Sequence, residues 1–379
     1  MSDDIRPITM PKWGLAMTEG LVTAWHLEEG AVVEKGAPAL DIETEKIANE
    51  FLSPAGGVLR RRLVDAGTTA PVGALLGVLA EASVTDEAID AFVESFNRRF
   101  AETLASRAEA DDTGPQPQTV DVDGQRTRYL VMGESDAAPL ALIHGFGADL
   151  NNWLFNQPAL AASRQVLALD LPGHGGSSKT LDADAHDLAS LTRAVIQLLD
   201  ALHMPAVHLA GHSLGGAVAL RLALDRPERV RSVTLLASAG LGPEINMEYV
   251  QGFIRAGRRK DLKPVVQQLF ADPALVSRDL LDDLLKFKRL DGVQELLTLI
   301  ADAVFADGAQ TSVMRDDLSR LEMPVQVIWG AEDRIIPARH TEGLPDAVRV
   351  QVLEGAGHMV HMEKAAEVNR LLEDHIEGS

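Results

Sequence analysis

The most informative segment of this chain is Asp41-Ile42-Glu43-Thr44-Glu45-Lys46-Ile47. It lies midway between two short segments that repeat each other with a constant offset of 37 residues. Matched glycines mark turns that need a positive φ, and the apolar residues between them mark short strands. The repeat therefore predicts two similar sheet halves, with Lys46 on the turn that joins them. The matched glycines are Gly20 with Gly57, Gly30 with Gly67, and Gly36 with Gly73.

Lys46 has two interpretations. A lone lysine on a turn is usually a solvated side chain, but one flanked by acidic and β-branched residues can also be recognised and acylated by another enzyme. The motifs around it are Met10–Leu15, Met17–Gly20, Glu43–Lys46 and Ser53–Gly57. Through these motifs, residues 5–81 resemble lipoyl domains, flattened β-barrels that carry lipoic acid on a lysine. Biotin carriers share the fold but place methionine on both sides of the lysine, so the resemblance implies lipoate on Lys46.

The composition excludes several functional classes. The chain has 379 residues, 46% of them apolar, which is enough for two packed domains. Its apolar runs are strand-length, far from the ~20 residues that cross a bilayer, and the N-terminus lacks a signal pattern. We therefore expect a soluble, cytoplasmic protein. With 56 acidic against 35 basic residues, the net charge is −21, which disfavours nucleic acid and anionic membranes as partners.

The absence of cysteine narrows the chemistry further. Without cysteine the chain has no disulfide, no thiolate metal ligand and no cysteine nucleophile. Any thiol chemistry must therefore come from a prosthetic group, and a dithiolane attached to Lys46 would supply it. We expect no metal site.

Residues 82–118 are expected to form a helical linker and hinge between a lipoyl-binding domain at 1–81 and a second domain at 119–379. From Asp86 to Ala108, apolar residues recur at spacings of three and four, which predicts a helix with one apolar stripe. The following residues 111–117 are rich in helix breakers. The stripe could pack on one of the chain's own domains or dock a partner subunit. Its members are Ile89, Phe92, Val93, Phe96, Phe100 and Leu104.

From Val120 onward, short apolar runs alternate with helical patterns. This alternation predicts a doubly wound α/β domain whose ligands collect at the carboxyl ends of parallel strands. About 80 residues from Gly240 to Arg320 interrupt the pattern and are interpreted as an inserted helical cap. The predicted strands are Leu140–Ile143, Val166–Leu169, Val207–Ala210, Val233–Leu236 and Val325–Trp329.

Gly211-His212-Ser213-Leu214-Gly215 follows one of these strands and opens a helical segment. The G-x-S-x-G pattern needs this context, because a strained strand-to-helix turn between glycines exposes the serine hydroxyl. Ser213 is the predicted nucleophile. It requires a base, and the base requires an acid that fixes its tautomer.

The predicted acid is Asp333, just beyond the strand that ends at Trp329, and the predicted base is His358, after a strand at Val348–Leu353. Both fall at strand ends, in the chain order serine, acid, histidine. Nearby competitors for these roles are His361, Glu332 and His212.

An oxyanion formed during attack needs two backbone N–H donors. We expect Leu214 to supply one and Phe146, in the segment His144–Gly147, to supply the other. With these motifs, residues 120–379 resemble the α/β-hydrolase family. Its members include esterases, peroxidases, thioesterases and acyltransferases, and some have lost activity. Dehalogenase chemistry would require aspartate at position 213.

A lipoyl domain fused to an α/β-hydrolase domain resembles the dihydrolipoyllysine-residue acetyltransferase family of acetoin dehydrogenase complexes. That resemblance implies acetyl transfer from lipoyl-lysine to coenzyme A in acetoin catabolism. It also implies two partners, a thiamine-diphosphate enzyme that cleaves acetoin and a dihydrolipoyl dehydrogenase. The trimer-forming catalytic domain of ordinary lipoyl acyltransferases is absent. Two alternatives stay open: a lipoyl-bearing hydrolase or thioesterase that releases a free acid, and a carrier whose second domain only binds.

A basic run lies within the expected cap. It could hold the phosphates of coenzyme A, or it could be the solvated face of a helix. The run consists of Arg255, Arg258, Arg259, Lys260 and Lys263.

Overall fold

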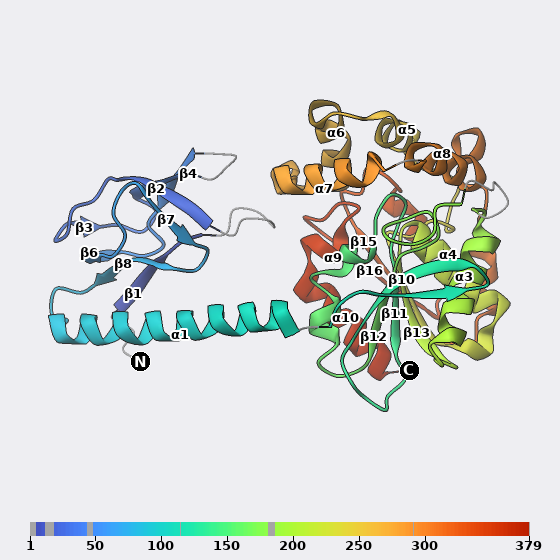
Figure 1. Cartoon of the computed structure of the whole chain (residues 1–379), viewed down its shortest axis with the longest axis horizontal. Coiled ribbons are helices and arrows are strands. Elements are labelled where there is room, and N and C mark those ends of the chain that lie inside the picture. The colour runs from blue at the N-terminus through green and yellow to red at the C-terminus, as the bar shows by residue number, and fades with distance from the viewer. Residues whose placement is uncertain are drawn as a thin grey trace. The chain divides into compact units, whose positions relative to one another are not determined.

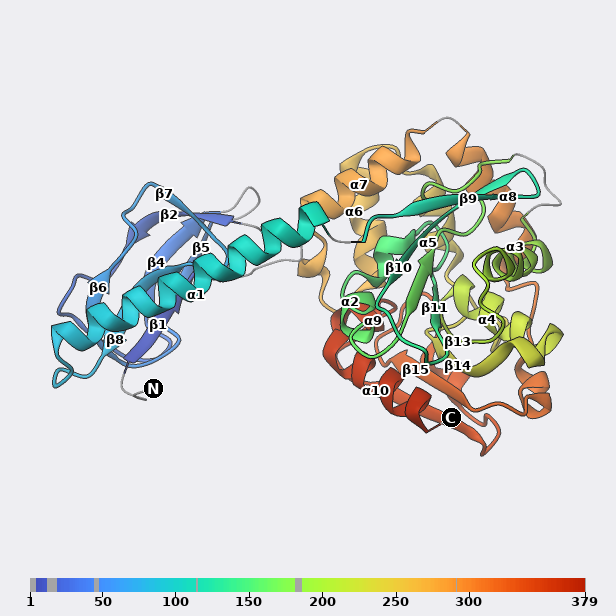
Figure 2. The same ribbon diagram turned by 60° about the horizontal axis from the view of Figure 1, so that its bottom comes forward.

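The chain divides into two compact units, Met1–Gly114 with Ser277–Leu280 and Pro115–Val276 with Leu281–Ser379 (Figures 1 and 2). Each unit is described by itself. Lys46 and residues 12–18, which include most of the motifs Met10–Leu15 and Met17–Gly20, lie outside the described residues. The computed structural model describes residues 5–11, 19–43, 48–113, 115–180, 186–290 and 292–378.

The first unit contains two four-stranded antiparallel sheets. Their strand orders are β1-β8-β6-β3 and β5-β4-β2-β7. The offset of 37 residues places β2 on β6, β3 on β7 and β4 on β8, so the order β8-β6-β3 in one sheet matches β4-β2-β7 in the other. This confirms the predicted pair of similar sheet halves. The strands are β1 (Ile5–Thr9), β2 (Glu19–Trp25), β3 (Val32–Val33), β4 (Pro38–Glu43), β5 (Ala48–Leu52), β6 (Gly57–Arg62), β7 (Thr68–Pro71) and β8 (Leu75–Ala80).

Two of the three predicted glycine turns are confirmed. Gly30 and Gly67 have φ of +89° and +88°, and Gly36 and Gly73 have +85° and +86°. The turn expected at Gly20 is wrong, because this residue lies inside β2 and pairs with Ala70. A repeated glycine therefore marks a turn only where the strand pattern also stops.

The connection from β4 to β5 carries the predicted modification site. The two strands pair in antiparallel register, and the register closes with Glu43 opposite Ala48. Residues 44–47 connect them in sequence and lie outside the described residues. A four-residue connection at the end of a strand pair fits the expectation that Lys46 lies on a turn, which stays a prediction.

Helix α1 (Asp86–Thr113) follows the second sheet half. It runs five residues beyond the end predicted at Ala108, so the breaker-rich segment begins inside the helix. The Thr85 hydroxyl accepts a hydrogen bond from Ala88 N at 3.3 Å at its N-terminus. Ile89 is fully buried against strands of the same unit, and Phe92, Val93 and Phe96 pack beside it. The apolar stripe therefore covers the chain's own sheet over its first half.

The second unit is built on one eight-stranded sheet with the order β16-β15-β14-β13-β11-β12-β10-β9. All pairs from β16 to β12 are parallel, while β10 pairs antiparallel with both β12 and β9. The five strands listed above and the strand predicted at Val348–Leu353 are all confirmed, and the antiparallel edge was not predicted. The strands are β9 (Gln118–Val122), β10 (Gln125–Met132), β11 (Leu140–Ile143), β12 (Val166–Leu169), β13 (Val207–His212), β14 (Val230–Leu236), β15 (Val325–Gly330) and β16 (Val348–Leu353).

Helices cover both faces of this sheet (Figures 1 and 2). On one face, α2 (Gln157–Leu160) and α10 (Ala365–Glu377) pack against alternate strand residues. Helices α3 (Leu188–Ala201) and α4 (Leu214–Asp225) lie on the other face. The predicted doubly wound α/β architecture is confirmed.

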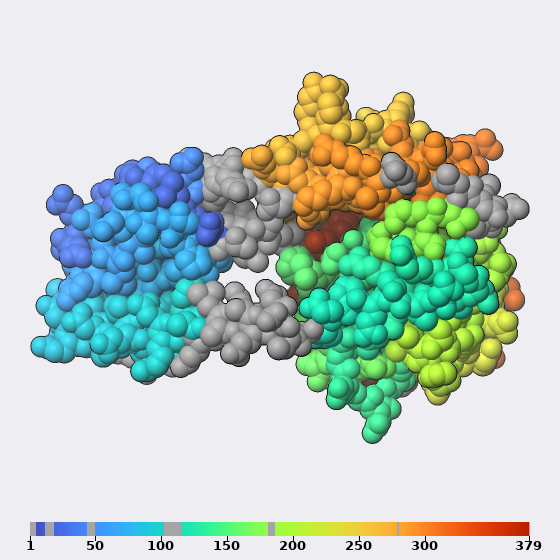
Figure 3. All heavy atoms as spheres, in the orientation of Figure 1, coloured from blue at the N-terminus to red at the C-terminus, as the bar shows by residue number. Residues whose placement is uncertain are grey.

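A helical insertion separates β14 from β15, as the sequence predicts. Figure 3 shows it in yellow and orange as a layer at one end of the second unit. Its function as a lid stays a prediction. Within the described parts of the chain, no helix is both long enough and apolar enough to cross a bilayer. The helices of the insertion are α5 (Met247–Arg255), α6 (Arg259–Val266), α7 (Arg278–Lys288) and α8 (Val293–Val304).

Candidate active site

Ser213 lies on a strained turn between β13 and α4. Its φ is +54°, a conformation that residues with a Cβ atom adopt only when the surroundings enforce it. The neighbouring glycines make the turn possible, because a Cβ atom at Gly211 would meet the backbone of Gly215, and one at Gly215 would meet the backbone of Ile143. The Ser213 side chain does not cap α4. The predicted elbow geometry is therefore present.

Asp333 and His358 are in direct contact. His358 Nδ1 lies 2.9 Å from Asp333 Oδ2, and both side chains are almost completely buried. The other carboxylate oxygen, Oδ1, accepts hydrogen bonds from Ile335 N at 2.8 Å and Ile336 N at 3.0 Å. Those two bonds fix the carboxylate, so that Oδ2 faces the imidazole. An Nδ1–H donor in this pair leaves Nε2 of His358 as the basic nitrogen.

The three predicted triad residues meet at the same edge of the sheet. Ser213 follows β13, Asp333 follows β15 and His358 follows β16, and these strands are parallel. The structure connects the serine turn to the histidine loop through His212, whose Nε2 donates to the carbonyl oxygen of His358 at 3.0 Å. Their assignment as a catalytic triad stays a prediction.

The competing residues have other tasks in the structure. Glu332 accepts hydrogen bonds from Gly355 N at 3.1 Å and Ala356 N at 3.0 Å, and so holds the loop that leads to His358. His212 is a backbone anchor, because its Nδ1 contacts Asn152 Nδ2 at 3.3 Å while its Nε2 binds the His358 carbonyl. His361 is fully buried, with its ring against the rings of Trp153 and His212.

Burial lowers the pKa of four histidines near His358. Burial lowers the pKa of His144 to about 4 and that of His361 to about 3. Burial also lowers the pKa of His174 and of His212 well below the usual histidine value. These four side chains are therefore neutral at pH 7. His358 differs from them in having the Asp333 carboxylate within hydrogen-bond distance of its ring.

The predicted oxyanion loop lies against the nucleophile. It follows β11, the parallel neighbour of β13, and a Cβ atom added to Gly145 would lie 3.0 Å from the Ser213 Cβ. Within the described residues, the backbone N–H groups of Phe146 and Leu214 have no protein acceptor, so both are available to an oxyanion. His144 shapes the loop, because its Nδ1 contacts Gly145 O at 2.8 Å and its Nε2 accepts from Leu171 N at 3.0 Å.

Aromatic side chains from the insertion cover Phe146. The Phe146 ring centroid lies 6.2 Å from that of Phe253 on α5 and 6.0 Å from that of Phe305, which follows α8. Phe146, Phe253 and Phe305 are all largely buried. Nothing in the sequence singles out Phe253 or Phe305, because an aromatic residue in or next to an amphipathic helix has no local pattern that shows which distant side chain it contacts.

Two arginines of the basic run in the insertion pair with aspartates. Arg258 pairs with Asp261 at 2.7 Å, and Arg259 pairs with Asp282. Arg255 Nε donates to the Gln251 carbonyl at 3.2 Å. These pairings favour the solvated-face interpretation, and a role in binding coenzyme A phosphates stays untested.

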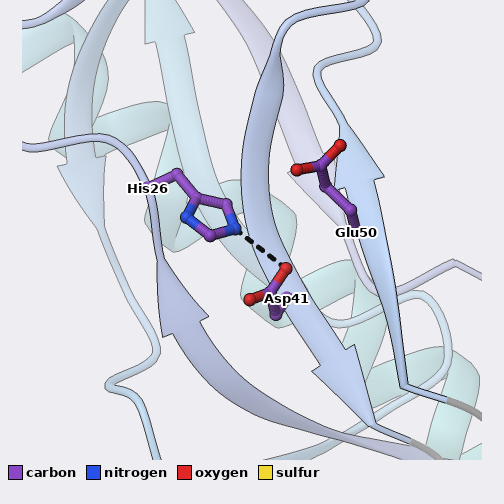
Figure 4. Close-up of side chains that lie close together, drawn as sticks. All are labelled: His26, Asp41 and Glu50. Carbon is purple, nitrogen blue, oxygen red and sulfur yellow. Dashed lines mark hydrogen bonds and ion pairs between the residues drawn. The ribbon is translucent and has the colours of Figure 1, made fainter.

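One group of metal-binding side-chain types occurs among the described residues. His26, which follows β2, lies beside Asp41 on β4 and Glu50 on β5, and their ligand atoms are within 4.8 Å of one another (Figure 4). His26 Nε2 lies 2.8 Å from Asp41 Oδ1, and the side chains are on the surface. A hydrogen bond between His26 and Asp41 accounts for this arrangement, and we assign no metal to it.

Comparison with known proteins places both parts of the chain. Residues 138–365 match the family described as the alpha/beta hydrolase fold, and residues 6–79 match the one described as biotin-requiring enzyme. A membrane phospholipase A of known structure superposes with a TM-score of 0.62 at 26% identity, covering 77% of this chain and 95% of that one.

Two relatives match almost the whole chain. One from Pseudomonas putida is 51% identical over 97% of both chains. One from Cupriavidus necator is 47% identical over 100% of this chain and 99% of the relative. Each is named a dihydrolipoyllysine-residue acetyltransferase component of an acetoin cleaving system.

Proposed function

Because the chain belongs to the family of dihydrolipoyllysine-residue acetyltransferase components of acetoin cleaving systems, we propose that its second unit transfers acetyl groups to coenzyme A through Ser213, His358 and Asp333. The observation that carries this proposal is the buried hydrogen bond between Asp333 and His358, at the same sheet edge as a serine held at positive φ. A buried, carboxylate-bound histidine next to a serine elbow is an arrangement for nucleophilic catalysis.

In the first step, Ser213 Oγ attacks the carbonyl carbon of an acyl thioester while His358 Nε2 takes the hydroxyl proton. Asp333 stabilises the resulting imidazolium through Nδ1. The N–H groups of Phe146 and Leu214 donate to the oxyanion. The C–S bond then breaks, and the leaving sulfur receives the proton from His358 Nε2. This step leaves an acyl-serine and a free thiol.

In the second step, coenzyme A resolves the acyl-serine. His358 Nε2 takes the proton of the incoming thiol, the sulfur attacks the acyl carbon, and Ser213 Oγ leaves with that proton. Water would compete for the same intermediate and would make the enzyme a thioesterase. The aromatic cover that Phe253 and Phe305 place on Phe146 supports transfer, because an apolar cover disfavours bound water.

Lipoate belongs to this family's chemistry, and Lys46 is the residue that would hold it, through an amide on the side-chain nitrogen. The closing register of β4 and β5 at Glu43 and Ala48 supports this assignment, since it leaves only four residues to connect the strands. When bound, the group supplies the dithiol that a chain without cysteine lacks. The protein acts within a multicomponent system. A thiamine-diphosphate enzyme that cleaves acetoin and a dihydrolipoyl dehydrogenase are the proposed partners.

The test uses the full-length protein from lipoate-fed cells and a soluble acetyl thioester. We expect Ser213→Ala to abolish both the acetyl-enzyme mass shift and acetyl-coenzyme A formation. Ser319→Ala, which replaces an exposed serine, is the matched control and should behave like the wild type.

Two further arms separate the rival functions. Lys46→Arg should remove the lipoyl mass shift while Ser213 is still acetylated by the soluble thioester. Acetate release that does not depend on coenzyme A would identify a thioesterase. Full acetyl-coenzyme A formation by Ser213→Ala would reduce the second unit to a binding domain and overturn the proposal.

A further inference from the structure

The Glu363 carboxylate joins two segments that are far apart in the sequence. It is the last residue of α9 (Val360–Glu363). Its Oε2 accepts a hydrogen bond from Gly357 N at 2.7 Å, and its Oε1 accepts one from Ala271 N at 2.8 Å. Gly357 immediately precedes His358, and Ala271 belongs to the insertion. One side chain therefore ties the histidine loop to the insertion.

The two segments also touch through their backbones. Met359 N, on the other side of His358, donates to the Leu269 carbonyl at 3.1 Å. A Cβ atom at Gly357 would lie 2.8 Å from Ala271 N and 2.9 Å from the Leu269 oxygen, so any larger residue would push the segments apart. Residues 269–271 of the insertion thus contact the chain immediately before and after His358.

The contacts to Glu363 differ from those to Glu332. Glu332 lies next to Asp333, after β15, and holds the histidine loop from the side of the sheet. Glu363 holds the following residue of that loop from the side of the insertion. Burial raises the pKa of the Glu363 carboxyl, and among the described residues no cation pairs with it. Its charge is balanced by backbone N–H groups, which need both carboxylate oxygens as acceptors.

We propose that Glu363 is a positioning residue, which fixes His358 relative to Asp333 and couples that geometry to the insertion. The inference rests on the proposed function, in which His358 is the base. Loss of either hydrogen bond would free the Gly357 amide or the insertion segment. A displacement of His358 by a fraction of an ångström would then slow proton transfer, because acid–base catalysis depends steeply on geometry.

The test compares Glu363→Gln with Glu354→Gln in the full-length protein. A glutamine side chain has one acceptor oxygen, so it can serve only one of the two amides. Glu354 is an exposed carboxylate on the same loop, which makes it the matched control. Three quantities are measured: the rate of Ser213 acetylation by a soluble acetyl thioester, the melting temperature, and the downfield proton resonance of His358 Nδ1–H, which is assigned by its loss in Asp333→Asn.

We expect Glu363→Gln to slow acetylation roughly tenfold and to shift or broaden the Nδ1–H resonance. Glu354→Gln should change neither. An unchanged rate would overturn the inference. A slower rate with an unchanged resonance and a lower melting temperature would also overturn it, since that combination indicates a purely structural role.

If Glu363→Gln does not fold, Glu363→Asp provides a second test. Glu363→Asp keeps the charge but is one methylene shorter, so it cannot span both amides and should show the same two changes. The proposed function has its own readout, because acetylation that persists in Ser213→Ala contradicts that function whatever Glu363 does.

Discussion

At the level of single residues, the two carboxylate oxygens of Asp333 bind different partners. Oδ1 binds two backbone amides of its own loop, and Oδ2 binds His358. The amides therefore orient the carboxylate, and the carboxylate selects the histidine tautomer. Asparagine has nearly the same shape as aspartate but no charge. Asp333→Asn therefore tests the choice of histidine tautomer while the bonds that orient the side chain are kept.

We expect Asp333→Asn to keep the fold but to lose about 10⁴-fold in the rate of Ser213 acetylation, as in other enzymes with this triad. The asparagine oxygen would still accept from Ile335 and Ile336, leaving an NH₂ group toward His358 Nδ1. His358 Nδ1 would then accept a hydrogen bond and carry no proton. The ring proton would sit on Nε2, which could not act as a base. Acetylation kinetics by mass spectrometry measure the loss, and the melting temperature controls for folding. A variant that acetylates at the wild-type rate would disprove the role of Asp333.

At the scale of the element, α1 is held by both packing and charge. Ile89 is fully buried against the sheet of β1 and β8, while Arg60 on β6 pairs with Asp86 at 2.9 Å. The ion pair is largely exposed on its acidic side and contributes little. The helix therefore depends mainly on its apolar stripe.

We expect Ile89→Ala to destabilise the first unit by about 2–4 kcal/mol, because it leaves a cavity beneath the helix. Hydrogen exchange of the full-length protein should show faster exchange in α1, β1 and β8 and unchanged exchange in β13 and β15. Glu87→Ala, an exposed change in the first turn of the same helix, is the control. Unaltered exchange in Ile89→Ala would mean that the stripe is not what fixes α1.

At the scale of the whole molecule, buried histidines make stability depend on pH. His144 and His208 have pKa values of about 4, and His361 about 3, in each case mainly because burial disfavours the charged ring. An unfolded histidine has a pKa of about 6.5. Below that pH the unfolded chain binds protons that the folded chain does not, so these groups leave stability intact above pH 6.5 and reduce it as the pH falls toward their folded values.

We expect the second unit to lose stability between pH 6.5 and pH 4, with roughly 1.4 kcal/mol per pH unit from each such histidine. His361→Leu removes one of them, so its melting temperature relative to the wild type should rise as the pH is lowered from 7.5 to 5. His203→Asn, a change at an exposed histidine, should show no such trend. A constant difference between His361→Leu and the wild type across this range would contradict the assignment.

The sequence alone predicted the order of the two folds, the parallel strands and the candidate site residues. It could do so because these depend on local patterns: a glycine repeat, buried strands of fixed length, and a serine between glycines. Gly20 shows where local patterns fail, because a repeated glycine inside a strand has the same sequence signal as one in a turn. Helix α1 likewise runs through residues with little helical preference.

The contacts that support the candidate site could be found only in the three-dimensional structure. Asp333 and His358 are 25 residues apart, and their contact follows from two parallel strands ending side by side. The bonds of Glu363 to Gly357 and Ala271, and the placement of Phe253 and Phe305 on Phe146, join segments that share no local pattern. A hydrogen bond between distant segments depends on where packing leaves each backbone group, and no local run of residues encodes that position.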